Sequence, residues 1–241
     1  MSVVAMFRVG IAVLAAAALF GVATLAFGQD VVPIKWTADV KITPNKAGTP
    51  SHPRGVVVDV RARIHIPSDY DPPLIESVTI WIGPGGIYNG AKFPTCNFEA
   101  LRRSGPKVCP ERSIVGHATV TASADGVKTY PKITIINGGA TKFYFYGVLN
   151  YPARLREALP VTVTRLTSGP WKYRWHFKIP SRLQIVAGIP LRAEAFHGVF
   201  GREDWLASTS CPPDGRWRGY GEVHYGSGQV VSARRSVACR S

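Results

Sequence analysis

The stretch 56-VVVDVRARIHI-66 decides the fold, because apolar and polar side chains alternate along most of it. One parity is entirely apolar and consists of Val56, Val58, Val60, Ala62, Ile64 and Ile66. The other parity carries the polar side chains Asp59, Arg61, Arg63 and His65. A period of two places the two sets on opposite faces of a strand, so one face is buried and the other is wet.

A second run, Trp171 to Lys178, has the same period with different side chains. Its apolar parity is aromatic and consists of Trp171, Tyr173, Trp175 and Phe177. Its other parity is basic and consists of Lys172, Arg174, His176 and Lys178. The pattern predicts a strand with an aromatic buried face and a basic wet face.

Ten further short β-patterned runs between residues 34 and 238 are separated by Gly, Pro, Asn or Ser. The turn 226–228 predicts a hairpin between 221–225 and 229–238. Two short helical turns are expected in loops, one capped by Asn97 over 98–103 and one opened by Pro152 through Glu157. The pattern favours an all-β fold, an antiparallel β-sandwich packed as two sheets or as a jelly roll, with residues 29–241 forming a single domain.

Residues 1–28 have the organisation of a secretory signal peptide. Arg8 precedes an apolar run from Val9 to Phe27, and Ala26 and Gly28 supply the small residues of a cleavage site before Gln29. The run of about 19 apolar residues also approaches the length that spans a bilayer, so a retained N-terminal anchor is the alternative. Either reading predicts a secreted or cell-envelope, extracytoplasmic protein, with membrane contact only if the segment is retained.

The charge of the chain is strongly basic. Its 241 residues include 29 Lys+Arg and 15 Asp+Glu, a formal net charge of +14. Removal of residues 1–28 takes away only Arg8, so 28 basic against 15 acidic residues leave +13. Such an excess attracts anions, and outside the cell an anionic cell-wall polymer or polysaccharide is the expected partner. The export signal disfavours specific nucleic-acid binding, and the alternative is a charged surface that serves solubility alone.

The four cysteines predict disulfides, because an exported chain meets an oxidising environment and its cysteines are even in number and lack metal-ligand spacing. Three pairings are open, and we predict Cys96–Cys109, which would staple the capped helical turn, and Cys211–Cys239, which would tie the terminal hairpin to the chain end. Zinc is disfavoured because neither CxxC pairs nor Cys/His clusters occur, and no cofactor is predicted.

The patch FPTC (93–96), GPKVCP (105–110) and SIVG (113–116) resembles an element of uncharacterised secreted actinobacterial β proteins. In that group the two cysteines look like a closed loop that leads into a strand. The resemblance covers about 25 residues and implies extracytoplasmic location and disulfide bonding, with no activity to carry over.

Catalytic motifs are weak. Ser227 lies in Gly226-Ser227-Gly228, which lacks the Gly-x-Ser-x-Gly form of a nucleophile elbow. Glu222 with the adjacent pair Glu203-Asp204 is the tempting set of carboxylates for glycoside hydrolysis. Tyr88, Trp205 and Trp217 are aromatic residues expected in loops, where planar rings would stack on sugars.

We therefore predict a non-enzymatic β-sandwich protein of the cell envelope that binds an anionic polymer or surface through a basic face. The residues assigned to that face are Arg61, Arg63, His65, Lys172, Arg174, His176, Lys178 and Trp217. They form one basic field if the two alternating strands share a sheet face, and a split field if they lie on opposite sheets. A secreted polysaccharide hydrolase or lyase and a structural, partner-binding envelope protein are the alternatives.

Overall fold

A computed structural model of the chain describes residues 32–70 and 73–241. The segment 1–28, predicted as a signal peptide or anchor, lies outside the described residues. Val32–Ser241 forms one compact unit. In the part of the chain that the structure describes, no helix is long and apolar enough to cross a membrane.

Strands account for most of the described chain. In order they are β1 (Lys35–Thr43), β2 (Arg54–Gly55), β3 (Val57–His65), β4 (Ile75–Ile82), β5 (Gly86–Tyr88), β6 (Ile114–Ala124), β7 (Val127–Thr129), β8 (Lys132–Asn137), β9 (Lys142–Leu149), β10 (Leu155–Arg165), β11 (Tyr173–Lys178), β12 (Ile185–Val186), β13 (Ile189–Phe200), β14 (Leu206–Ser208), β15 (Arg216–Tyr225) and β16 (Val230–Ala238). The helical elements are α1 (Phe98–Ser104) and the 3₁₀ turns η1 (Gly90–Lys92), η2 (Pro106–Val108), η3 (Glu111–Ser113) and η4 (Ser181–Leu183).

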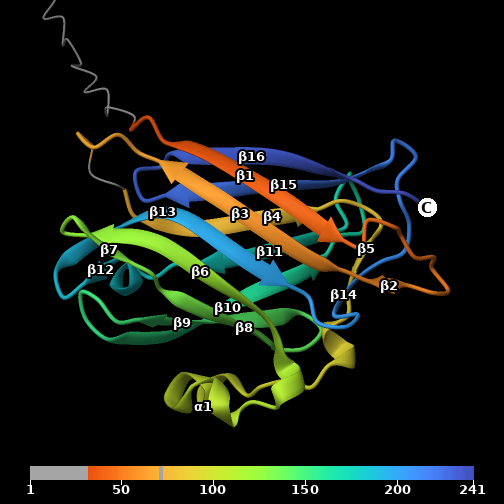
Figure 1. The fold of residues 1–241 in the computed structure, drawn as a ribbon, viewed down its shortest axis with the longest axis horizontal. Helices are drawn as coiled ribbons and strands as arrows, with labels where there is room; N and C mark the ends of the chain where they lie inside the picture. Colours follow the sequence, from red (N-terminus) through yellow and green to blue (C-terminus); the bar gives the residue numbers. More distant parts are fainter. Residues whose placement is uncertain (1–31, 71–72) are drawn as a thin grey trace, which may run out of the picture. The chain divides into compact units, whose positions relative to one another are not determined.

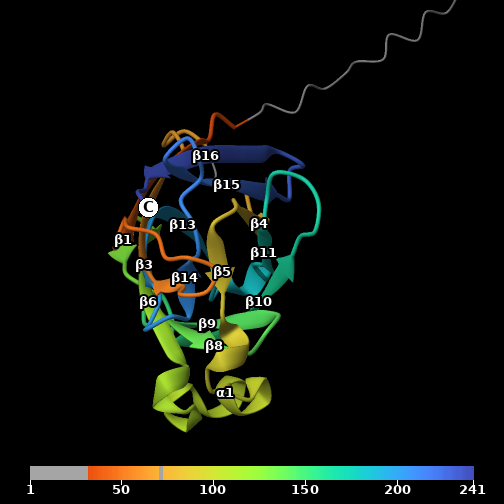
Figure 2. The ribbon, with the colours of Figure 1, turned by 90° about the vertical axis from the view of Figure 1, so that its right-hand side faces the viewer.

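Thirteen of the strands belong to one antiparallel sheet that curls into a nearly closed, barrel-like shape (Figure 1 and Figure 2). Its order is β1-β3-β13-β6-β8-β9-β10-β11-β4-β15-β16, with β7 paired to β6 and β12 to β13. The two ends of this order, β1 and β16, meet at a seam. There Ala47 N donates to Arg240 O at 2.7 Å, and Arg235 Nε donates to Ala38 O. We call this 13-stranded sheet the barrel-like sheet.

The predicted all-β antiparallel class is confirmed, but the predicted sandwich of two facing sheets is wrong. A sandwich and a barrel-like sheet both bury one face of every strand, so the same alternation of apolar and polar residues fits either architecture. The difference lies in long-range pairing. Here β13 pairs with β3 on one side and with β6 on the other, although β13 lies far from both in the sequence. The sheet therefore continues across β13, at a point where the strands of a sandwich would divide into two sheets.

A separate three-stranded sheet, β2-β14-β5, crosses one end of the barrel-like sheet (Figure 2). Val56 N donates to Leu206 O at 2.9 Å and Asn89 N donates to Trp205 O at 2.9 Å, which extends the pairing of β14 with β2 and with β5. We call this end of the barrel-like sheet the β5 end and the opposite end, where β7 and β12 lie, the β12 end (Figure 1).

One of the two predicted helical turns is present. Asn97 Oδ1 accepts from Ala100 N at 3.0 Å, so Asn97 caps α1 as predicted. The turn predicted from Pro152 through Glu157 is wrong, because β10 begins at Leu155 and pairs with β9 from that residue onward. Leu155, Leu159 and Val161 share the inner face of β10 in the barrel-like sheet. Their burial there outweighs the local preference for a helical turn that Pro152 indicates.

Both predicted disulfides are present: Cys96–Cys109 and Cys211–Cys239, with Cα–Cα distances of 5.0 and 5.7 Å. The first joins the residue before the α1 cap to a residue between η2 and η3, and the second joins the chain before β15 to the residue after β16. Because disulfides persist in oxidising compartments, the two bonds suggest an extracytoplasmic protein. The hairpin predicted around 226–228 is also present, as β15 and β16.

Candidate functional site

The barrel-like sheet encloses a cavity of about 560 Å³. Its walls are the apolar parities of the strands, which turn inward. The inward apolar side chains include Val40, Ile42, Val58, Val60, Ile80, Ile82, Ile133, Leu159, Phe177 and Phe196. Protein interiors normally leave few voids larger than a water molecule, so a cavity of this size is a feature of the fold and not a packing fault.

Strand number explains why the interior is hollow. A closed sheet of about 8 strands is just wide enough for side chains to fill, and its diameter grows with strand number. Eleven strands follow one another around the barrel-like sheet. A sheet of this width leaves space between its walls, although the rings of Trp175 on β11 and Phe200 on β13 still approach to 6.3 Å between centroids.

Glycines on the inner face enlarge the space further. A Cβ added at Gly147, Gly219 or Gly221 would find its nearest atom at 3.9, 3.7 and 3.9 Å, in each case a backbone oxygen of the neighbouring strand. No atom from the opposite wall comes within 4 Å of these positions. At these three glycines no side chain projects from the strand into the cavity. Glycine in a strand interior is unfavourable for stability, so the space is kept open at some cost.

The described chain has three clusters of buried hydrophobic side chains, of which one packs between α1 and the outer face of β9 and two lie inside the barrel-like sheet. One cluster at the β5 end includes Phe143, Trp175 and Trp205, and a second near the β12 end contains Ile34, Val223 and Tyr225. Between them, side chains such as Val58, Ile80 and Phe177 are apolar and point inward but remain only partly buried. The inner wall therefore presents apolar surface that no protein atom covers.

Asn137 fixes the closed β5 end. Its fully buried side chain donates from Nδ2 to Gly90 O at 2.9 Å and to Phe93 O at 3.2 Å. Its Oδ1 accepts from Trp205 Nε1 at 3.0 Å. Tyr88, whose hydroxyl donates to Gly139 O at 2.8 Å, packs edge-on against Trp205, and burial raises the pKa of Tyr88. The small sheet is thereby locked across this end.

Loop residues line the cavity at the β12 end. Gln184 holds this region together, because its Oε1 accepts from Ile75 N at 2.7 Å while its Nε2 donates to Ile75 O at 2.8 Å. Glu157, on the inner face of β10, is an acidic group among the lining residues. Arg182 of η4 donates from Nε to Glu157 Oε2 at 3.0 Å, and this bond raises the pKa of Arg182.

The predicted basic residues lie on two separate walls. Arg61, Arg63 and His65 are exposed on the outer face of β3, where Arg61 Nε lies 3.6 Å from Asp59 Oδ1. Arg174, His176 and Lys178 lie on the outer face of β11, with Lys172 just before it. Five strands separate β3 from β11 along the barrel-like sheet, and the two strands lie on opposite sides of the ring (Figure 2). The structure does not bring the two groups together, so the basic field is split.

The outer face around β11 carries a cross-strand row that the sequence did not reveal. Register places Arg174 beside Trp81, Trp81 beside Tyr220, and Tyr220 beside Arg234. The Arg234 guanidinium lies 4.8 Å from the Tyr220 ring centroid, and Trp171 stacks on Tyr220 at 6.1 Å. Trp171, predicted on the buried parity, thus contacts an outward ring.

The other aromatic candidates are buried. Trp217 donates from Nε1 to Ser210 O at 2.9 Å on the inner side, and Tyr88 and Trp205 belong to the closed β5 end. None of these three rings is available as an outer sugar platform. Glu203 pairs with Arg112 at 2.7 Å, while Glu222 accepts from Tyr220 OH at 2.5 Å, so each carboxylate is engaged by its own neighbours.

Within residues 32–70 and 73–241 no group of three or more His, Cys, Asp or Glu side chains is placed to hold a metal ion. Comparison with family models, curated proteins and solved structures finds no match to this chain. The resemblance of the 93–116 patch to secreted actinobacterial β proteins stays a prediction.

Proposed function

We propose that the protein binds a small hydrophobic or amphipathic molecule inside the barrel-like sheet. The observation that carries this proposal is the apolar cavity of about 560 Å³. Ligand sites typically have volumes of about 300–1,000 Å³, apolar walls and few polar groups. Displacing water from such walls is favourable at roughly 25 cal/mol per Å² of apolar surface, so the cavity supplies its own driving force.

Polar groups at the β12 end favour an amphipathic ligand. Glu157 and Arg182 form an ion pair there, while the walls deeper inside are aliphatic and aromatic. A ligand whose polar end stays beside this pair and whose apolar part lies between β3 and β11 keeps its own polar group out of the apolar space. Burying a lone polar group would cost about 1–3 kcal/mol.

Titration with Nile red, an apolar dye whose emission rises and shifts to the blue in apolar surroundings, tests this function. We expect one dye per chain, a dissociation constant of about micromolar order and displacement by a long-chain fatty acid. Emission that stays at its value in water at every protein concentration would contradict the proposal.

The predicted binding of an anionic polymer remains a second proposal, and the row of Arg174, Trp81, Tyr220 and Arg234 supports it. Two guanidinium groups flank two rings on one outer wall, an arrangement that suits a sugar chain bearing carboxylates or phosphates. The proposed surface is therefore the β11 wall, with Lys172 and Lys178, rather than the β3 wall.

Retention on an immobilised acidic polysaccharide compares the two walls. Arg174→Glu should reduce retention at low salt more than Arg61→Glu, although each reversal changes the net charge by the same amount. Equal losses would mean that net charge alone causes retention, and the polymer proposal would then be dropped.

A further inference from the structure

Exposed hydrophobic side chains gather at the β12 end. Leu74, Val127, Tyr130, Tyr151 and Ile185 are each at least 36% exposed, and Tyr130 reaches 60%. They make up five of the nine large hydrophobic side chains that are exposed in the described chain. Single exposed apolar residues need no explanation, but a group at one end of a ligand cavity does.

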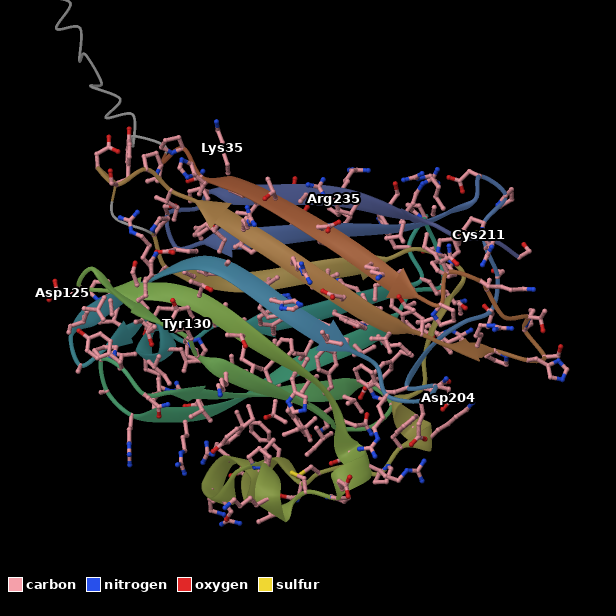
Figure 3. The ribbon with its side chains drawn as sticks, in the orientation of Figure 1. Lys35, Asp125, Tyr130, Asp204, Cys211 and Arg235 are labelled. Atoms are coloured by element: carbon pink, nitrogen blue, oxygen red, sulfur yellow. A yellow bond between two sulfur atoms is a disulfide. The ribbon has the colours of Figure 1, made fainter. Side chains whose placement is uncertain are left out.

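Strand pairing and a hydrogen bond place Val127, Tyr130, Tyr151 and Ile185 on neighbouring segments. Thr129 Oγ1 donates to Tyr151 O at 3.1 Å, which brings the segment of Tyr130 beside that of Tyr151. Ala124 lies opposite both Val127 and Leu191, and Ile185 pairs with Pro190 at the start of β13. Figure 3 shows Tyr130 at this end of the sheet, near the tip that carries Asp125.

Basic residues flank the same group. Lys132 and Arg156 lie on either side of Val148 across β8, β9 and β10, and both are exposed, as is Arg154. Among the described residues these three have no ion-pair partner, whereas Lys128 is paired with Glu194. Glu157, next to Arg156 in the chain, is paired with Arg182, and Glu194 is paired with Lys128. Asp125 at the hairpin tip therefore stands against three cations without an ion-pair partner among the described residues, and the flank is positive overall.

We propose that the β12 end docks on an anionic phospholipid bilayer, with Tyr130, Tyr151 and Ile185 entering the interface. Tyrosine rings suit the boundary between headgroups and acyl chains, and cations beside them attract anionic lipid. The inference rests on the proposed function, because it gives the apolar ligand a membrane source. Docking there brings the loop-lined end of the cavity, and not the end closed by Asn137, to the lipid surface.

Co-sedimentation with phosphatidylglycerol vesicles and with phosphatidylcholine vesicles tests the docking. The wild-type protein should bind the anionic vesicles more strongly, and Tyr130→Ser combined with Ile185→Ser should weaken that binding at least about tenfold. The matched control is Val57→Ser combined with Val199→Ser, since both valines are 38% exposed on the β3 and β13 wall. That control should stay within about twofold of the wild type.

Equal loss in the two double variants, or equal binding to both kinds of vesicle, would overturn the docking proposal. So would self-association through this end, seen as a dimer in ultracentrifugation that the Tyr130→Ser and Ile185→Ser changes abolish. Nile red binding without vesicles separates the two proposals. A protein that binds the dye but not vesicles keeps its cavity function and loses the docking, whereas the reverse result removes the cavity function alone.

Discussion

Trp36 on β1 donates a hydrogen bond from Nε1 to the hydroxyl oxygen of Tyr225 on β15, at 3.0 Å. The bond crosses the seam where the barrel-like sheet is not closed by a backbone ladder among the described residues. At the seam this side-chain bond adds to the short backbone contact in which Ala47 N donates to Arg240 O. Arg235, which donates to Ala38 O, is the second such link.

Replacing Tyr225 by Phe should lower the free energy of unfolding by about 1 kcal/mol, because the Trp36 N–H loses its acceptor while the ring packing is kept. Urea unfolding measures the change. Tyr130→Phe is the control, since Tyr130 is exposed, and it should alter stability by less than about 0.5 kcal/mol. Equal effects of the two changes would remove the role given to the seam bond.

Asn137→Ala should destabilise the protein by at least about 3 kcal/mol. The substitution leaves the carbonyl oxygens of Gly90 and Phe93 and the N–H of Trp205 without their partner in a fully buried place. Thermal unfolding followed by circular dichroism gives the measurement. Asn97→Ala, which removes the α1 cap, should cost only about 1 kcal/mol, and a similar cost at both positions would contradict this ranking.

Removal of each disulfide should lower the free energy of unfolding by an amount that depends on the length of the loop it closes. The loops close over 13 and 28 residues, which corresponds to about 3 and about 3.5 kcal/mol in the chain-entropy model. Paired Cys→Ser changes and guanidinium unfolding test this. Loss of Cys211–Cys239 should also speed hydrogen exchange in β16, and unchanged exchange there would show that the bond does not hold the seam region.

His176 should titrate below the ordinary histidine value of about 6.5. Burial lowers its pKa first, followed by the charges of Arg174 and Lys178 and by His224. Because the unfolded chain then binds the proton more tightly, the contribution of His176 to stability is complete above pH ~6.5 and is lost as the pH falls below it. NMR titration should show the midpoint moving up in Arg174→Ala, and a wild-type midpoint at or above 6.5 would refute the prediction.

Local signals in the sequence were sufficient for the strands whose apolar and polar residues alternate clearly. The alternation in 56–66 and 171–178 gave the correct faces for β3 and β11, because side-chain parity is a property of the strand itself. The Asn97 cap and both cysteine pairs involve neighbours near in sequence or at a hairpin base. Such features depend on short spacing, and all were confirmed.

The cavity and the closed β5 end depend on long-range pairing, which the sequence does not display. Asn137 reads as a turn residue in Asn-Gly-Gly, and its buried bonds appear only when β8 lies beside the segment 90–94. Trp205 and Tyr88 read as loop aromatics for the same reason. Gly219 and Gly221 are the sequence feature that could have indicated the cavity. They are two residues apart in a β-patterned run, so they lie on the same face of the strand, and neither has a side chain to fill the space.

The cavity itself is tested most directly by filling it. Gly221→Phe points a ring into the space without a close contact, since the nearest atom to its Cβ is Thr79 O at 3.9 Å. Thr37→Phe places the same ring on the outer face of β1, where Thr37 is exposed beside Arg63. Nile red affinity should fall at least about tenfold in Gly221→Phe and stay unchanged in Thr37→Phe, while ligand-free Gly221→Phe gains about 1 kcal/mol of stability. Unchanged dye affinity in Gly221→Phe, or a loss of about 1–3 kcal/mol as in a filled core, would contradict a ligand cavity inside the sheet.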